Sequence, residues 1–191
     1  MTDSTEPQQP PAPPAKKQPS MLREAMETIL FAVIIFLVLQ VVVRNFRIEG
    51  DSMLTAFENG QFVLVDRVSY RLGNPHRGDV VVFEYPRAPQ EDYIKRVIGL
   101  PGETIRIADG RVYINGQPLS EPYVNGQQTL SYRNITLTLA QDQYFVMGDN
   151  RNYSSDSRAW GSLPRANIIG KAWICYWPPS AWRLILRPQY P

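Results

Sequence analysis

Residues 108–119 read ADGRVYINGQPL, and this short stretch decides the fold class of the segment around it. Asp109-Gly110 and Asn115-Gly116 are dipeptides typical of two-residue hairpin turns, whose central residues need a positive φ. Between them stands RVYI, which carries the β-branched and aromatic residues that are enriched in strands. The stretch therefore predicts two successive hairpin turns between short antiparallel strands.

Short apolar runs broken by turn residues continue on both sides of this stretch. Seven segments are predicted as strands: residues 61–68, 78–85, 92–100, 103–107, 111–116, 143–149 and 167–177. No segment after residue 44 has a convincing long amphipathic helical pattern. We therefore predict a mainly β domain with an antiparallel sheet over residues 45–191.

A very different segment precedes this domain. Residues 29–43 read ILFAVIIFLVLQVVV, in which only Gln40 is polar. Counted from Ala25, the run would form a helix of about 28 Å, close to the roughly 30 Å of a bilayer core. A core helix of a globular protein is rarely apolar all round, and a cleaved secretory signal would be followed by small residues rather than RNFR. We predict a membrane-spanning helix over residues 23–44.

The basic residues around the predicted span indicate its orientation. Lys16, Lys17 and Arg23 precede the span, and Arg44 and Arg47 follow it. Basic residues are more frequent on the cytoplasmic side of a membrane. The count of three against two predicts a single-pass protein of the cell membrane with a cytoplasmic N-terminus and the β domain on the outer face.

Composition excludes several other kinds of protein. Residues 1–22 are rich in proline and have almost nothing to bury, which predicts a disordered tail. The net charge is only +2 and the 20 Lys and Arg are spread along the chain, so no nucleic-acid partner is expected. The single cysteine, Cys175, excludes an internal disulfide and a thiolate metal cluster, and its apolar neighbours predict burial.

Gly50-Asp51-Ser52-Met53 resembles the setting of a nucleophilic serine, which needs a neighbouring base. The nucleophile elbow of α/β-hydrolases requires a second glycine that is absent here. The GDSL-type esterases use a histidine near the C-terminus, whereas the only histidine in this chain is His76. His76 stands in NPHRGD, a sequence typical of an exposed turn, although a histidine triad remains an alternative.

A lysine can take the place of histidine if burial lowers its pKa towards neutrality. Only two lysines follow the predicted span, Lys95 and Lys171, and both stand in apolar strands. A suitable base should also lack an acidic partner. Strand alternation predicts that Tyr93, Lys95 and Val97 share one face, but local hydrophobicity does not separate the two lysines.

Four blocks in a fixed order show a resemblance to a known family: IEGDSML, RGDVVVFEYP, YIKRVIGLPGE and GDNRNYSSDSRAWG. The chain resembles the bacterial type I signal peptidases, which are membrane-anchored Ser-Lys endopeptidases. This resemblance implies an antiparallel β catalytic domain, Ser52 as nucleophile and Lys95 as general base. It also implies that no metal or cofactor takes part.

The last block of the resemblance implies supporting residues. Ser154 aligns with a serine whose hydroxyl helps to orient the lysine amine, and Gly148 with a glycine packed close to the lysine. Asp156 and Arg158 align with a charged pair that supports the site.

The resemblance also implies the substrate and its binding residues. Ile48, Tyr93 and Ile94 align with residues that line shallow apolar pockets, which suit small residues at positions −1 and −3 of the cleavage site. The expected partners are exported preproteins, which the enzyme would process beside the lipid bilayer that holds it.

Two positions depart from the family pattern. Thr55 and Ala56 stand where the family usually has proline and threonine, so the turn after the nucleophile lacks a residue with a fixed φ. Gly50 stands where some relatives have a serine that contributes to the oxyanion hole. The hole in this chain would therefore use main-chain N–H groups, including that of Ser52.

Two other functions remain open from the sequence. The chain could be a membrane-tethered relative that binds preproteins without cleaving them, which the missing proline suggests. It could also be a self-cleaving Ser-Lys regulator, but such a protein needs a DNA-binding helix pair where this chain has an apolar span.

Overall fold

The computed structural model describes residues 21–131 and 134–190, and the chain divides into two compact units between Val38 and Leu39. Helix α1 (Met21–Val42) is long and apolar enough to cross a membrane, and none of its apolar window is buried. At 22 residues it measures about 33 Å, against roughly 30 Å for a bilayer core. Residues 1–20 of the expected Pro-rich tail lie outside the described residues.

The helix covers Met21–Val42 rather than the expected residues 23–44, because the chain enters a sheet earlier than the hydropathy pattern suggests. Strand β1 (Val43–Arg47) pairs with β2 (Phe62–Asp66), beginning with Val43 opposite Asp66. The apolar run therefore ends inside the first strand of the β domain.

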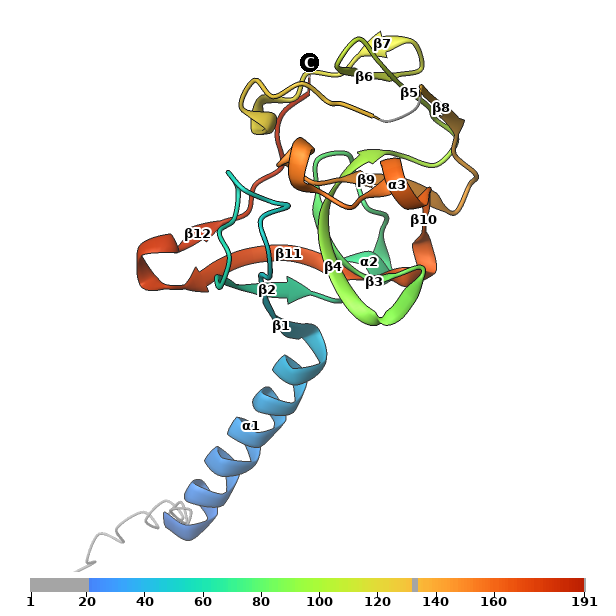
Figure 1. The fold of residues 1–191 in the computed structure, drawn as a ribbon. Coiled ribbons are helices and arrows are strands. Elements are labelled where there is room, and N and C mark those ends of the chain that lie inside the picture. Colours follow the sequence, from blue (N-terminus) through green and yellow to red (C-terminus); the bar gives the residue numbers. More distant parts are fainter. Residues whose placement is uncertain (1–20, 132–133, 191) are drawn as a thin grey trace, which may run out of the picture. The chain divides into compact units, whose positions relative to one another are not determined.

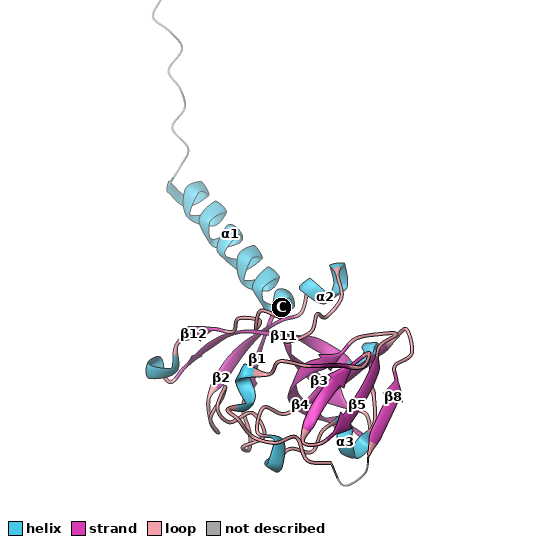
Figure 2. Cartoon of the chain, turned by 90° about the horizontal axis from the view of Figure 1, so that it is seen from above, coloured by secondary structure: helices cyan, strands magenta, loops and turns pink. Residues whose placement is uncertain are grey.

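A large antiparallel sheet forms most of the β domain (Figures 1 and 2). Its strand order is β1-β2-β11-β3-β4-β9-β10, with β12 pairing with β11. Besides β1 and β2 it comprises β3 (Val80–Tyr85), β4 (Ala88–Gly99), β9 (Gln143–Met147), β10 (Leu163–Pro164), β11 (Ile168–Trp177) and β12 (Arg183–Leu184). All pairs of neighbouring strands in the described part of this sheet are antiparallel, which confirms the predicted fold class.

A second, four-stranded sheet contains the stretch with the two hairpin turns and lies at the top of the view in Figure 1. Its order is β7-β6-β5-β8, and its strands are β5 (Thr104–Ala108), β6 (Arg111–Ile114), β7 (Gln117–Pro118) and β8 (Ile135–Thr138). Asp109, Gly110, Asn115 and Gly116 all have positive φ. Both predicted hairpin turns are therefore confirmed, since each needs two such residues.

Helices after α1 are single turns in the described part of the chain. They are the α-helices α2 (Ser69–Leu72) and α3 (Ser157–Trp160) and the 3₁₀ turns η1 (Pro122–Val124), η2 (Arg151–Tyr153), η3 (Arg165–Asn167) and η4 (Pro179–Ala181). This agrees with the expected lack of a long amphipathic helix after residue 44.

Alternating side chains build the core of the β domain. In β2, Val63 and Val65 are fully buried while their neighbours are only partly covered, as the period of a strand requires. Cys175 of β11 packs in the same cluster and is fully buried, which confirms the prediction for this residue.

Strand β4 changes partners along its length, and this positions the site. Its first part pairs with β3, from Asp92 opposite Glu84 to Arg96 opposite Val80. On its other edge β4 pairs with β9 only from Arg96 to Gly99. Within the described strands, residues 91–95 of β4 therefore have one unpaired edge.

Gly170 is a position where two strands approach too closely for a side chain. A Cβ built there would lie 2.3 Å from the main-chain oxygen of Asp66 in β2. We expect Gly170→Ala to lower the free energy of unfolding by about 1–3 kcal/mol, because the backbone has to shift. Thermal unfolding of the purified chain in detergent measures the effect.

Gly73→Ala is the matched control. Its Cβ would meet only the oxygen of Ser69 at 3.5 Å, an ordinary contact, and its φ is −148°. We expect little change in melting temperature for this variant. Equal stability of the two variants would contradict the close approach of β11 and β2.

Candidate active site

Ser52 lies in a tight turn between β1 and β2. Phe57 N–H donates to the Met53 carbonyl at 2.8 Å, and the Met53 and Phe57 side chains are buried in the domain core. Leu54 N–H donates to the Asp51 carbonyl at 3.1 Å. These contacts hold the turn against the domain core and leave Ser52 itself partly exposed.

Lys95 of β4 reaches this turn from the opposite side of the site. Its Nζ donates to Ser52 Oγ at 2.8 Å and to the Ile94 carbonyl at 2.9 Å. The Lys95 residue is only 4% exposed, and its amine lies 5.3 Å from the centre of the Tyr93 ring, a residue on the same strand face. The structure thus brings together the two residues that the sequence predicted as a pair.

The surroundings of Lys95 disfavour a charged amine. Burial is the main cause that lowers its pKa from 10.5 to about 8, because few groups near the amine can replace water. The carboxylates of Asp156 and Asp149 act in the opposite direction, but they do not outweigh burial. An amine with this pKa is neutral in a substantial fraction of molecules near neutral pH, so it can accept a proton.

The structure separates Lys95 from the other candidate bases. Lys171 forms an ion pair with Asp79 at 2.8 Å, so it has the acidic partner that a lysine base should lack. His76 is exposed, as its turn sequence predicted, and its main-chain N–H donates to Asp79. In the described part of the chain, Lys95 is the only one of these three residues that forms a hydrogen bond to Ser52.

The segment after β9 holds the serine turn in place. Asn150 donates from its main-chain N–H to the Ser52 carbonyl at 3.1 Å and from its side chain to the Asp51 carbonyl at 3.0 Å. A Cβ on Gly148 would lie 2.3 Å from Ser154 Oγ and 2.4 Å from the Ser52 carbonyl oxygen. The resemblance had implied that Gly148 packs close to the lysine. The atoms nearest to a Cβ at Gly148 belong instead to Ser154 and Ser52.

Ser154 was expected to orient the lysine amine. Its hydroxyl oxygen is buried and makes no hydrogen bond within the described part of the chain, so its expected bond to Lys95 is not formed in this structure. Asp156 and Arg158 do form an ion pair, at 2.8 Å. Asp156 also accepts the Gly148 N–H at 3.1 Å, so the pair supports the segment that holds the serine turn.

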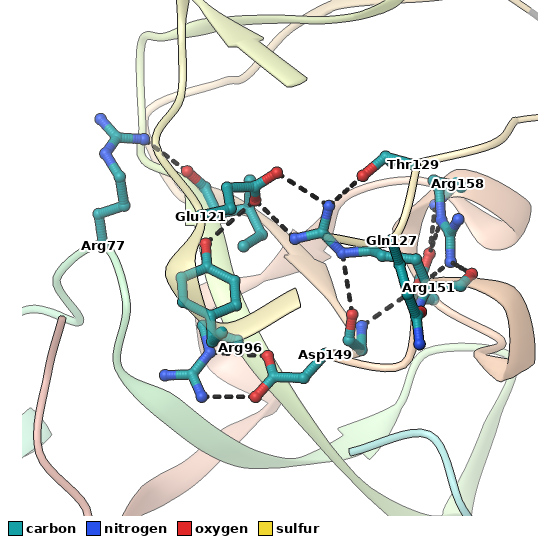
Figure 3. A network of polar contacts seen from close by, with 12 residues as sticks. Arg77, Arg96, Glu121, Gln127, Thr129, Asp149, Arg151 and Arg158 are labelled. Atoms are coloured by element: carbon teal, nitrogen blue, oxygen red, sulfur yellow. Dashed lines mark hydrogen bonds and ion pairs between the residues drawn. The ribbon is translucent and has the colours of Figure 1, made fainter. Parts of the chain in front are cut away.

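Two buried arginines near the site were not predicted (Figure 3). Arg96, beside Lys95, forms two hydrogen bonds to Asp149 at 2.7 and 2.5 Å. Arg151 binds both carboxylate oxygens of Glu121, at 2.9 and 2.5 Å, and its side chain is fully buried. Asp149 and Arg151 stand in the GDNR block and could have been singled out there. Glu121 lies outside every quoted block, so no sequence signal pointed to it.

Thr55, which replaces the usual proline, also contacts the segment around Glu121. Its hydroxyl donates to the Tyr123 carbonyl at 3.2 Å. Gly50 has a φ of +79°, a conformation that favours glycine at the start of the turn. The turn after Ser52 is therefore restrained by a hydrogen bond where a proline would restrain it by its ring.

An open cleft of about 670 Å³ lies over Ser52 and Lys95. Its lining comprises Phe46, Arg47, Glu49, Gly50, Asp51, Ser52, Glu91, Asp92, Tyr93, Ile94, Lys95, Tyr153 and Ser155. Tyr93 and Ile94, which the resemblance implied as substrate-binding residues, are among the residues that line this cleft. Ile48 does not line the cleft: it is 1% exposed and packs in the core beneath it.

The described residues include no group of three His, Cys, Asp or Glu side chains that could hold a metal ion. The site presents a hydroxyl, an amine of lowered pKa beside it, and a cleft that both residues line. This arrangement suits nucleophilic attack on a carbonyl group.

Comparison with known proteins gives consistent matches. The family model described as "Signal peptidase, peptidase S26" matches residues 22–177. A signal peptidase I of Leptolyngbya laminosa is 43% identical over 188 residues, which cover 93% of this chain and 92% of that protein. A probable signal peptidase I-1 of Synechocystis is 40% identical over 169 residues, which cover 84% of this chain and 85% of that protein. Signal peptidase IB of Staphylococcus aureus MRSA252 is 32% identical over an alignment that covers 88% of this chain and 98% of that protein.

Burial of the Lys95 amine predicts a pH-dependent cost in stability. The folded chain binds this proton less tightly than the unfolded chain, since its pKa is about 8 against 10.5 for a free lysine. Below pH 8 this difference lowers the free energy of unfolding by its full amount, about 3 kcal/mol. The loss disappears as the pH rises towards 10.5. We expect Lys95→Met to be more stable than the wild type at pH 7 and to lose this advantage between pH 8 and 10.5, as measured by thermal unfolding in detergent.

Lys171→Met is the control for this measurement, because its amine is paired with Asp79. Removal of that amine leaves a buried carboxylate with one partner fewer, so we expect no gain in stability at pH 7. A stability difference between Lys95→Met and the wild type that is the same from pH 7 to pH 10.5 would contradict the lowered pKa.

Proposed function

The chain belongs to the signal peptidase family, peptidase S26, and we propose that Ser52 and Lys95 are the nucleophile and general base with which it cleaves signal peptides. It is a serine endopeptidase, because its relatives are named signal peptidase I and peptidase S26 is a family of serine endopeptidases. The observation that carries the assignment is the 2.8 Å contact between Lys95 Nζ and Ser52 Oγ, made by an amine whose pKa is lowered to about 8.

The reaction begins with a proton transfer. Neutral Lys95 accepts the Ser52 hydroxyl proton while Ser52 Oγ attacks the carbonyl carbon of the residue at position −1. The tetrahedral intermediate then collapses, the C–N bond breaks, and the Lys95 ammonium gives its proton to the leaving amine. The signal peptide stays bound to Ser52 as an ester.

Water completes the cycle. Lys95, neutral again, takes a proton from a water molecule that attacks the ester carbonyl, and the proton returns to Ser52 Oγ as the signal peptide leaves. One amine thus serves as base and as acid in turn, which requires a pKa near the working pH.

The developing oxyanion needs a hydrogen-bond donor. Ser52 N–H has no hydrogen-bond partner among the described residues, so it is free to donate to the substrate. Loss of one such donor typically lowers kcat by about 10²–10³. Gly50 has no side chain to contribute, which supports a hole built from main-chain groups.

The open edge of β4 offers a path for the substrate. Residues 91–95 form one wall of the cleft and have unpaired main-chain groups on that side, so an extended preprotein segment can add as a strand. Tyr93 and Ile94 would contact its side chains, which supports a preference for small residues at positions −1 and −3. Ile48 does not reach the cleft, so it would support the substrate-binding residues only by packing in the core.

Helix α1 supports a membrane-anchored enzyme, since it is long enough and apolar enough to cross a bilayer. We infer a single pass through the cell membrane, with the N-terminus in the cytoplasm and the β domain on the outer face. Three basic residues precede the apolar run of residues 29–43 and two follow it directly, and this difference favours the proposed orientation. An anchored enzyme keeps its cleft near the surface from which preproteins emerge, and this proximity increases the rate.

The two other functions considered for the sequence are not favoured. The named relatives are peptidases, which speaks against a tethered binder that does not cleave. A self-cleaving regulator would need DNA-binding helices near the N-terminus, where the described residues form the apolar α1.

Substitution of the pair tests the assignment. With the full-length chain in detergent and a preprotein that carries an Ala-x-Ala cleavage site, we expect Ser52→Ala and Lys95→Ala to lower cleavage by 10³-fold or more. Accumulation of the shortened protein on a gel measures the rate. Addition of a chelator should leave the wild-type rate unchanged.

Matched variants serve as controls. Ser155→Ala removes another hydroxyl of the same cleft, Lys171→Met removes the other lysine of the β domain, and His76→Ala removes the only histidine. We expect all three to keep cleavage within a few-fold of wild type. Activity that survives Lys95→Ala but disappears in His76→Ala would overturn the assignment.

The pH dependence of cleavage tests the state of the amine. Because only neutral Lys95 is a base, kcat/KM should rise about tenfold per pH unit below pH 8 and level off above it. Initial rates measured between pH 6 and pH 10 on the same preprotein check this. A profile that is flat from neutral to alkaline pH would refute Lys95 as the base.

A further inference from the structure

A second pocket, separate from the cleft, is lined by arginines. It has a volume of about 280 Å³. Its lining comprises Arg44, Arg67, Tyr70, Arg71, Glu84, Arg165, Ala166, Asn167, Ile168 and Ile169. Four arginines and a single acidic residue thus line one small pocket, and none of these residues lines the cleft over Ser52.

Contacts within the β domain occupy two of the four arginines. Arg165 donates to the main-chain carbonyls of Tyr70 and Gly73, and it lies over the Tyr70 ring. Arg44 forms an ion pair with Asp92 at 2.9 Å. These contacts hold the two guanidinium groups in place at the edge of the pocket.

The other two arginines have no partner of their own. No side-chain hydrogen bond or ion pair of Arg67 or Arg71 is found among the described residues. They stand four residues apart, on either side of the start of helix α2. The Asp66 carboxylate nearby accepts hydrogen bonds from the Val68 and Ser69 main-chain N–H groups and forms no ion pair with either arginine among the described residues.

The pocket lies where the chain leaves the apolar helix. Arg44 follows Val42, the last residue of α1, by two positions, and Arg67 N–H donates to the Val42 carbonyl at 3.0 Å. The main chain of two lining residues is therefore within a few ångströms of the end of the membrane-spanning segment. A ligand from the bilayer surface would reach this pocket without crossing the β domain.

We propose that this pocket binds the phosphate group of an anionic lipid headgroup. Arginine presents several N–H donors in a plane and binds phosphate oxygens in pairs, so unpaired Arg67 and Arg71 fit a phosphodiester. Basic residues next to a membrane span are attracted to the negative charge of anionic lipids. The inference does not depend on the roles of Ser52 and Lys95.

Binding of short-chain lipids to the full-length chain tests the proposal. The protein in a neutral detergent is titrated with dioctanoyl phosphatidylglycerol, dioctanoyl phosphatidylcholine or inorganic phosphate, and native mass spectrometry counts the bound molecules. We expect the phosphatidylglycerol adduct to be retained more strongly than the phosphatidylcholine adduct. Arg67→Gln combined with Arg71→Gln should weaken the phosphatidylglycerol adduct by on the order of tenfold.

Arg106→Gln combined with Arg111→Gln is the matched control. It removes the same charge from the small sheet, at residues that do not line the pocket. We expect it to keep the wild-type affinity for phosphatidylglycerol. Cleavage of a preprotein by both double variants verifies that they are folded.

The arms of the experiment distinguish the sources of the phosphate group. Weak binding of inorganic phosphate beside strong binding of phosphatidylglycerol supports a lipid headgroup, whereas equal binding of both supports a soluble phosphate in the same pocket. If both double variants weakened phosphatidylglycerol binding equally, the effect would come from the net charge of the protein rather than from this pocket. That result would overturn the proposal. Wild-type affinity in the Arg67 and Arg71 double variant would overturn it as well.

Discussion

The burial of one amine is the constraint on which the site depends. Lys95 stands on a central strand, nine-tenths or more of it is covered, and the nearest acceptors are a hydroxyl and a main-chain carbonyl rather than a carboxylate. Lysine usually avoids such a position, because a charged amine loses its water there. Here the same loss of water makes the amine a base at moderate pH. The cost in folding free energy and the capacity to accept a proton have one physical origin.

The rest of the domain keeps the Ser52 hydroxyl within reach of that amine. Asn150 holds the serine turn through two main-chain carbonyls, and Arg151 joins the Asn150 segment to Glu121 (Figure 3). Thr55 then connects the turn back to the carbonyl of Tyr123, two residues after Glu121. These contacts form a closed chain of hydrogen bonds, so a turn without the usual proline can still be held in one conformation.

Membrane attachment and chemistry are built into different parts of the same large sheet. Strand β1 begins directly after α1 and ends beside the cleft, where Phe46 and Arg47 form part of the lining. The arginine pocket is formed at the other end of β1, by Arg44, by Arg67 just after β2, and by residues from α2, β3, η3 and β11. A short strand thus separates a surface suited to lipid headgroups from the peptidase cleft, and both positions follow from the pairing of β1 with β2.

The sequence by itself determined the fold class and the apolar helix, and it predicted the pair Ser52 and Lys95, because these depend on local patterns: turn dipeptides, strand alternation, a long apolar run and short blocks. Only the tertiary structure decided which lysine is buried without a carboxylate, since Lys95 and Lys171 stand in equally apolar strands and differ by the distant Asp79. It also decided that Ile48 packs in the core, that Gly148 contacts two serines, and that Glu121 binds Arg151. Such contacts join residues far apart in the chain, and no local pattern carries them.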